Sequence, residues 1–292
     1  MNRAQFVSTA SAFALASGAS TARGATPSRS LWVWRTALAE AGTVASFVQR
    51  NRFRLIFLSV TSAERSALAA GDVASLDAIR VLKGDERLVY AVAGDPSWVK
   101  HERSEPPDSV RELLEAHRRH RVFDGLALDV EPHTLPEWND DAEQVEVAEN
   151  YLQALGVIRS AAAALDLPVL ATVHPTYAKY RPPAADGATL LQAASRAVDA
   201  TDLMAYRNSE ETLESFGGAA MDQLAALAKP WWLGVSTHTG SPAGTSYATL
   251  PASRFFPDVD ATAAEVARRY GGAFAGISVE DYRNTLVLLG QG

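Results

Sequence analysis

Residues 123 to 133 read FDGLALDVEPH, an apolar strand-like segment that carries two carboxylates one residue apart. Side chains alternate between the two faces of a strand, so Asp129 and Glu131 share a face with the small Ala127. Pro132 then ends the strand. Two neighbouring acids raise each other's pKa, which suits a general acid better than a structural pair held by an interior arginine or lysine. The segment therefore predicts a strand that leads into a catalytic site.

Similar strand-like runs recur along the chain, separated by amphipathic helical segments, which is the pattern of βα units around a parallel sheet. These runs begin at Leu31, Arg54, Arg87, Phe123, Pro168, Thr201, Trp231 and Phe274. Eight strands with intervening helices predict an α/β fold, a single-domain (β/α)8 TIM barrel, with a short last helix because only NTLVLLGQG follows. Active sites of such barrels lie at the C-terminal ends of the strands, where Asp129 and Glu131 are expected.

The N-terminal residues 1–25 have the composition of an export signal, and residues 26–292 are expected to form the barrel. Arg3 precedes a mildly apolar segment rich in Ala and Ser, which ends in small residues at Ala19 and Ala22. The pattern predicts an exported protein, periplasmic or secreted, although a disordered Ala/Ser-rich leader is the alternative. The chain has no cysteine, so disulfides and thiolate metal sites are excluded.

Charge and hydropathy exclude several classes of partner. The net charge of −7 is spread along the chain without a basic stripe, which argues against nucleic acid. No apolar run is long enough to span a membrane once the signal is removed. The first strand is followed by WVWRTALAEAG rather than by a glycine-rich phosphate loop, so no nucleotide or other cofactor is expected. We expect a monomer.

The spacing of Asp124, Asp129 and Glu131 resembles the DxxDxDxE signature of the chitinase-like family 18 glycoside hydrolases, in a degenerate form. TDLMAYR resembles the sixth-strand M-x-Y motif of that family, KPWWLGV its lysine before an apolar strand, and FAGISVED its eighth-strand G-G-[VI] pattern. The resemblance implies a (β/α)8 barrel and substrate-assisted hydrolysis, in which a neighbouring N-acetyl group attacks the anomeric carbon.

Matched residue by residue, the resemblance implies that Glu131 protonates the glycosidic oxygen. Asp129 would hold the acetamido group, and Tyr206 would hydrogen-bond the intermediate. Two departures argue against a chitinase proper: Ala127 replaces the middle aspartate, and Arg207 replaces the acidic or amide residue after the tyrosine. A guanidinium there could pair with Asp129 or Glu131, or bind an anionic sugar such as a uronic acid.

Other polar and aromatic residues fall at or near strand ends and are predicted to contact a carbohydrate, since aromatic faces stack on pyranose rings. They are His133, His174, His238, Trp34, Asp95, Trp98, Asp124 and Glu280. Trp138 and Tyr177 have similar positions, whereas Trp32, Trp231 and Trp232 are expected to pack in the core.

These observations favour an exported glycoside hydrolase that acts on a polysaccharide or amino-sugar glycan by acid catalysis, without a metal. One alternative is a catalytically silent carbohydrate-binding barrel, because Ala127 and Arg207 break the family pattern. Another is a metal-dependent hydrolase built on His133, His174 and His238, since strand-end imidazoles form catalytic zinc sites. The LDVE sequence also resembles that of family 25 muramidases, which leaves peptidoglycan open as a substrate.

Overall fold

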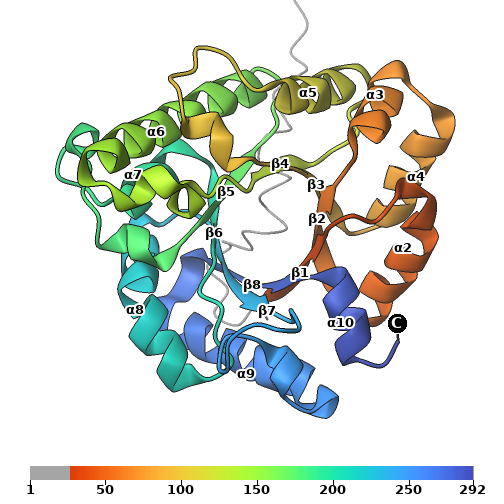
Figure 1. The fold of residues 1–292 in the computed structure, drawn as a ribbon. Coiled ribbons are helices and arrows are strands. Elements are labelled where there is room, and N and C mark those ends of the chain that lie inside the picture. The colour runs from red at the N-terminus through yellow and green to blue at the C-terminus, as the bar shows by residue number, and fades with distance from the viewer. Residues whose placement is uncertain (1–26, 292) are drawn as a thin grey trace, which may run out of the picture.

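The computed structural model describes residues 27–291, so the predicted leader, residues 1–25, lies outside the described residues. Eight parallel strands close into a barrel in the order of the sequence (Figure 1). The strands are β1 (Ser28–Val33), β2 (Phe53–Ser59), β3 (Leu88–Ala93), β4 (Gly125–Leu128), β5 (Val169–Val173), β6 (Ala200–Leu203), β7 (Trp231–Ser236) and β8 (Phe274–Glu280). The predicted TIM barrel is confirmed, with all eight strands where the sequence places them.

Helices surround the barrel on its outer side (Figure 1). They are α2 (Ala41–Arg50), α3 (Ser62–Ala70), α4 (Val73–Lys83), α5 (Asp108–His120), α6 (Asp141–Ala163), α7 (Leu190–Ala197), α8 (Glu210–Leu227), α9 (Phe255–Tyr270) and α10 (Tyr282–Leu288). The last helix has seven residues, as expected from the short tail of the sequence. Within residues 27–291, none of the helices combines the length and the apolar character needed to cross a bilayer.

The alternation of side chains along β4 separates two apolar layers. Ala127 belongs to the barrel interior, where it packs with Trp32, Phe57 and Trp232. Leu126, Leu128 and Val130 belong to the larger layer between the strands and the helices. The predicted faces of this strand are therefore confirmed, and Trp32, Trp231 and Trp232 are core residues as expected.

The strand itself is shorter than predicted, since β4 ends at Leu128 and its acids follow it. The amide of Asp129 still donates to the carbonyl of Ala93, 3.0 Å away, but Pro132 starts a 3-10 turn (Pro132–Thr134). Gly94 lies against this corner so closely that a Cβ on it would meet the carbonyl oxygen of Asp129 at 2.0 Å. The acids thus lie on a turn that a glycine allows to pack against β3.

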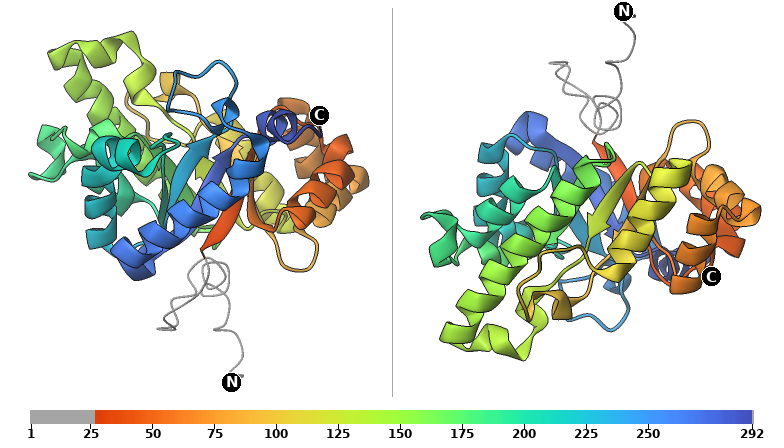
Figure 2. Two further views of the ribbon diagram at one scale, coloured as in Figure 1. Left: turned by 90° about the horizontal axis from the view of Figure 1, so that it is seen from below. Right: turned by 90° about the horizontal axis from the view of Figure 1, so that it is seen from above.

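A long connection joins β7 to α9. It contains two short 3-10 turns, Tyr247–Thr249 and Ala252–Arg254, and α9 begins at Phe255. Side views show this connection extending beyond the strand ends on the same side as the segment from β4 to α6 (Figure 2). The C-terminal end of the barrel therefore has a wall that helices alone would not provide.

Candidate active site

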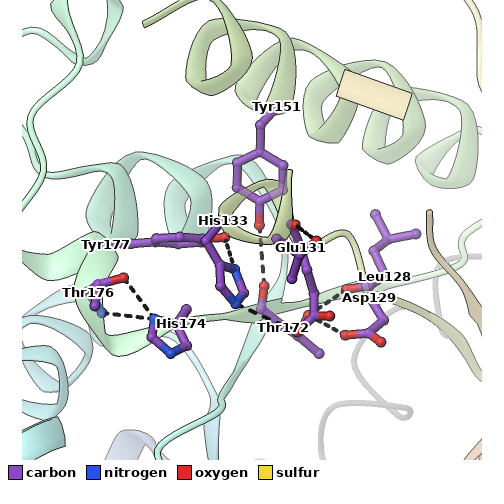
Figure 3. A network of polar contacts seen from close by, with 10 residues as sticks. Leu128, Asp129, Glu131, His133, Tyr151, Thr172, His174, Thr176 and Tyr177 are labelled. Carbon is purple, nitrogen blue, oxygen red and sulfur yellow. Dashed lines mark hydrogen bonds and ion pairs between the residues drawn. The ribbon is translucent and has the colours of Figure 1, made fainter. Parts of the chain in front are cut away.

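The first acid, Asp129, is held just beyond β4 by a residue of β5. Its Oδ1 accepts a hydrogen bond of 2.8 Å from the Thr172 hydroxyl, and the Tyr151 hydroxyl donates to the Thr172 carbonyl at 3.2 Å (Figure 3). Burial raises the pKa of Asp129, and the hydrogen bond from Thr172 offsets part of that rise. The result is an oriented carboxylate at the floor of the barrel mouth.

The second acid, Glu131, reaches into an open cavity of about 300 Å³, where its side chain is 33% exposed. Burial raises its pKa to about 7, and the nearby charge of Asp129 adds to the rise. A carboxyl with this pKa retains its proton over much of the range below neutral pH, as a general acid requires.

The cavity is lined by residues from four strand ends, from α8 and from the β7–α9 connection. The residues that line it are Glu131, His133, His174, Met204, Tyr206, Arg207, Phe216, Ser236, Ser241, Pro242 and Thr245. Five of the predicted site residues, Glu131, His133, His174, Tyr206 and Arg207, are thus brought together. Phe216 and the loop residues were not foreseen, although the length and Gly/Pro/Ser content of the loop are typical of a segment that lines a cleft.

Two histidines form one wall. The rings of His133 and His174 stack with centroids 4.4 Å apart, and Nδ1 of His133 lies 2.8 Å from the Tyr177 hydroxyl. Burial lowers the pKa of His133 to about 4, and burial also lowers that of His174. Both are neutral near pH 7. When the Tyr177 hydroxyl donates to Nδ1, the remaining proton is on Nε2, which faces Glu131 Oε1 at 3.9 Å.

Tyr206 follows β6 and lies among carboxyl groups from three strands. Burial raises its pKa well above the ordinary value, and the charges of Glu280 and Asp129 act in the same direction. Burial also raises the pKa of Glu280 to about 7, partly offset by a hydrogen bond from Tyr206. Glu280 therefore lies near the acid pair, and Tyr206 remains a neutral hydrogen-bond donor there.

Arg207, next in the chain, has a different environment. Its Cζ lies 3.7 Å from the centre of the Phe216 ring, and NH1 donates to the Tyr206 carbonyl at 2.6 Å. Of the two predicted alternatives, pairing with Asp129 or Glu131 is not observed, because the hydrogen bond that the Arg207 guanidinium makes within residues 27–291 goes to the Tyr206 carbonyl. Burial lowers the pKa of Arg207.

One buried acid, Asp202 on β6, was not anticipated. It is 2% exposed and accepts hydrogen bonds from Trp32 Nε1 at 3.1 Å and from the Ser278 hydroxyl at 2.7 Å. Burial raises its pKa to about 6, with Asp129 contributing. It pairs in register with Thr172, which holds Asp129. Because its partners come from β1 and β8, no local pattern in the sequence indicates its environment.

Two predicted contact residues are corrected. Asp124 lies at the opposite end of the barrel, because it precedes β4, and its carboxylate is bound by Lys83 Nζ and the Val89 amide, each at 2.9 Å. Trp98, only 8% exposed, packs in the layer between strands and helices because its 3-10 turn (Pro96–Val99) folds back over that layer. Neither can contact a substrate in the cavity.

Three other predicted residues lie at the C-terminal end of the barrel but do not line the cavity. His238 is exposed on the β7–α9 connection, and Asp95 caps a turn by accepting from the Ser97 amide at 2.8 Å. Trp34 is partly exposed and stacks on Trp32 with ring centroids 5.3 Å apart. These three residues are therefore placed outside the pocket that holds Glu131.

The three histidines of the metal hypothesis do not converge, since His238 lies apart from the stacked His133 and His174. Throughout residues 27–291, no group of three or more His, Cys, Asp or Glu side chains has an arrangement that could hold a metal ion. The described residues therefore do not fit a protein-bound catalytic metal.

No protein-family model matches the sequence, and no curated protein matches it. Solved structures do match. A chitinase from Chromobacterium violaceum ATCC 12472 is 17% identical, with a TM-score of 0.54, covering 91% of this chain and 98% of its own. A class V chitinase from Pseudomonas fluorescens Pf-5 is 13% identical, with a TM-score of 0.54 and coverages of 91% and 99%.

A third similar structure is the PgaB (BpsB) glycoside hydrolase domain from Bordetella bronchiseptica, with 12% identity, a TM-score of 0.50 and coverages of 89% and 95%. These likenesses extend over almost the whole barrel, while the identity is low in every case. They show that the chain has the fold of these glycoside hydrolases.

Proposed function

We propose that the protein is a glycoside hydrolase in which Glu131 is the general acid. The observation that carries the proposal is the Glu131 carboxyl in the cavity, with its pKa raised to about 7 by burial and by Asp129. General acids work best when their pKa lies near the working pH. The similar solved structures support the class of reaction, because those named above are chitinases and a glycoside hydrolase domain.

In the proposed reaction, Glu131 gives its proton to the glycosidic oxygen as the bond between that oxygen and the anomeric carbon breaks. The oxygen of a neighbouring acetamido group bonds to the anomeric carbon in its place. Water then attacks that carbon, the bond to the acetamido oxygen breaks, and Glu131 takes a proton from the water. An amino-sugar glycan is the substrate that this sequence of steps requires.

Asp129 and Tyr206 are proposed to hold the acetamido group during these steps. The Thr172 hydroxyl occupies Oδ1 of Asp129, and no other side chain among residues 27–291 donates to its Oδ2. That oxygen is therefore available to accept the amide proton of the substrate. In the proposed complex, the neutral Tyr206 hydroxyl on the β6 side of the cavity donates to the acetamido group in place of Glu280.

Replacement of Glu131 by Gln tests the proposal, since the amide keeps the shape but cannot transfer the proton. Turnover of amino-sugar oligosaccharides should fall by about two to four orders of magnitude while binding persists. Glu137→Gln is the matched control, because Glu137 pairs with Lys100 outside the cavity and should be dispensable. Wild-type turnover in Glu131→Gln would refute the role of this acid. Absence of turnover by the unmodified protein on any glycan would favour a carbohydrate-binding barrel.

We also propose that the protein acts outside the cytoplasm. The support comes from the composition of residues 1–25, with Arg3 before a mildly apolar segment and small residues near Ala19 and Ala22. Polymeric glycans outside the cell are substrates that an exported hydrolase can reach.

A further inference from the structure

One part of the cavity wall carries a positive charge that is not paired with a carboxylate. Of the described residues that line the cavity, Arg207 is the one cation. Burial lowers its pKa, and within residues 27–291 the hydrogen bond that it donates goes to a backbone carbonyl and not to a carboxylate. A partly desolvated guanidinium without an acid partner is costly, and a ligand that brings an anion would remove that cost.

The guanidinium is held in place rather than free to move. The Phe216 ring on α8 lies under it, 3.7 Å from ring centre to Cζ, and NH1 donates to the Tyr206 carbonyl at 2.6 Å. Stacking fixes the plane of the guanidinium, and one of its three nitrogens is used. The Nε and NH2 groups have no hydrogen-bond acceptor in the part of the chain that the structure describes, so they remain available as a pair of donors.

The surrounding side chains do not compensate this charge. His174 stands edge-on to the same Phe216 ring, with centroids 5.6 Å apart, and its pKa is lowered by burial and by Arg207. Glu131, with a pKa of about 7, is largely protonated when it acts as an acid. The cavity thus offers a fixed cation beside neutral hydrogen-bonding groups, in a chain whose net charge is −7.

We propose that the cavity binds a glycan that carries a carboxylate next to the cleaved bond, and that Arg207 selects it through a two-point contact from Nε and NH2. This inference deepens the proposed function and rests on it. The carboxylate could belong to a uronic acid or to a lactyl ether on an amino sugar. Both present the same planar group, which an arginine matches better than a lysine does.

Calorimetric binding to the Glu131→Gln protein tests the inference without interference from turnover. Two pairs of oligosaccharides are compared, and in each pair one member has a carboxylate and the other lacks it. The first pair is a uronic acid oligosaccharide and its carboxyl-reduced form. The second is an N-acetylglucosamine oligosaccharide with and without the lactyl ether. We expect binding about tenfold to a hundredfold tighter for the carboxylated member of at least one pair. The pair that shows the preference identifies the source of the carboxylate.

Adding Arg207→Gln should abolish the preference, whereas Arg207→Lys should retain part of it. Arg269→Gln is the matched control, since Arg269 also lies over an aromatic ring, that of Tyr270, but does not line the cavity. The preference should also weaken as salt increases, which needs no further variant.

Equal affinity within both pairs, or no measurable binding of any member, would overturn the inference. So would a preference that survives Arg207→Gln. A failure of the proposed function would be recognised differently, by unchanged turnover in the single Glu131→Gln variant. The two failures are therefore distinguishable.

Discussion

At the scale of single residues, the site depends on how its carboxyl groups retain protons. Four acids from three strands have raised pKa values, and burial is the first cause for each: Asp129, Glu131, Asp202 and Glu280. The sequence predicts the first two because they alternate along one strand. It cannot predict that Asp202 meets Trp32 and Ser278, since those contacts form only when β1, β6 and β8 converge in the barrel.

The pH dependence of kcat/KM should report Glu131. Its proton is present below a pKa of about 7 and is lost as the pH rises through that value, so activity should fall on the alkaline side near pH 7. Asp129→Asn removes a negative charge that raises this pKa. In this variant the alkaline limb of the kcat/KM profile should therefore move to lower pH, in addition to any loss of rate.

Glu131 and Glu280 both have a pKa of about 7, and Glu280→Gln shows which of the two titrations the activity follows. Burial and Asp129 are the main causes of the raised pKa of Glu131, so the alkaline limb of the pH–rate profile should persist in this variant. If the alkaline limb of the kcat/KM profile disappears in Glu280→Gln, the titrating group is not Glu131. The same conclusion follows if the limb does not move in Asp129→Asn.

At the scale of elements, the strands are predictable and their ends are not. Both faces of a parallel barrel strand are buried, so apolar runs such as RLIFLSV and PVLATVH identify strands directly. The segment FDGLALDVE was expected to be extended as far as Glu131, but β4 stops at Leu128. Just after β3, Gly94 packs against the backbone of Asp129, a contact distant in sequence that no local pattern indicates.

Gly94→Ala tests whether this contact positions the acids. A Cβ there would lie 2.0 Å from the Asp129 carbonyl oxygen and 2.9 Å from its Cα, so the corner must move. We expect turnover to fall about tenfold to a hundredfold, as a displacement of about 1 Å can cause, and stability to fall by about 1–3 kcal/mol. Kinetics and chemical denaturation measure the two effects.

Gly156→Ala is the matched control, because Gly156 lies within α6 and a Cβ on it meets nothing within 4 Å. It should leave turnover unchanged and raise stability by about 0.5–1 kcal/mol, since alanine favours a helix over glycine. If both variants behave alike, the close packing of Gly94 on Asp129 has no role in positioning.

At the scale of the whole molecule, closure of the barrel gathers residues that the sequence separates widely. Tyr206 and Glu280 lie near each other although one follows β6 and the other ends β8, and Phe216 reaches Arg207 from α8. The sequence predicts the mouth as the location of the site. It does not predict which strand-end residues face the cavity, and so His238, Asp95 and Trp34 were expected there but lie outside it.

The proposed export concerns the whole chain and has its own test. Mass spectrometry of the protein from its native host should find a mature chain that begins shortly after Ala19 or Ala22. Recovery of an intact chain from the cytoplasm, beginning at Met1, would contradict the expectation.

The proposed proton transfer from Glu131 to the leaving group can be tested by varying that group. Hydrolysis of aryl glycosides of N-acetylglucosamine oligosaccharides by the wild-type and Glu131→Gln proteins is measured across leaving groups of increasing acidity. An acidic leaving group departs without a proton. The deficit of the variant should therefore shrink from about two to four orders of magnitude for poor leaving groups to a few-fold for the most acidic. A deficit of the same size for every leaving group would contradict the claim.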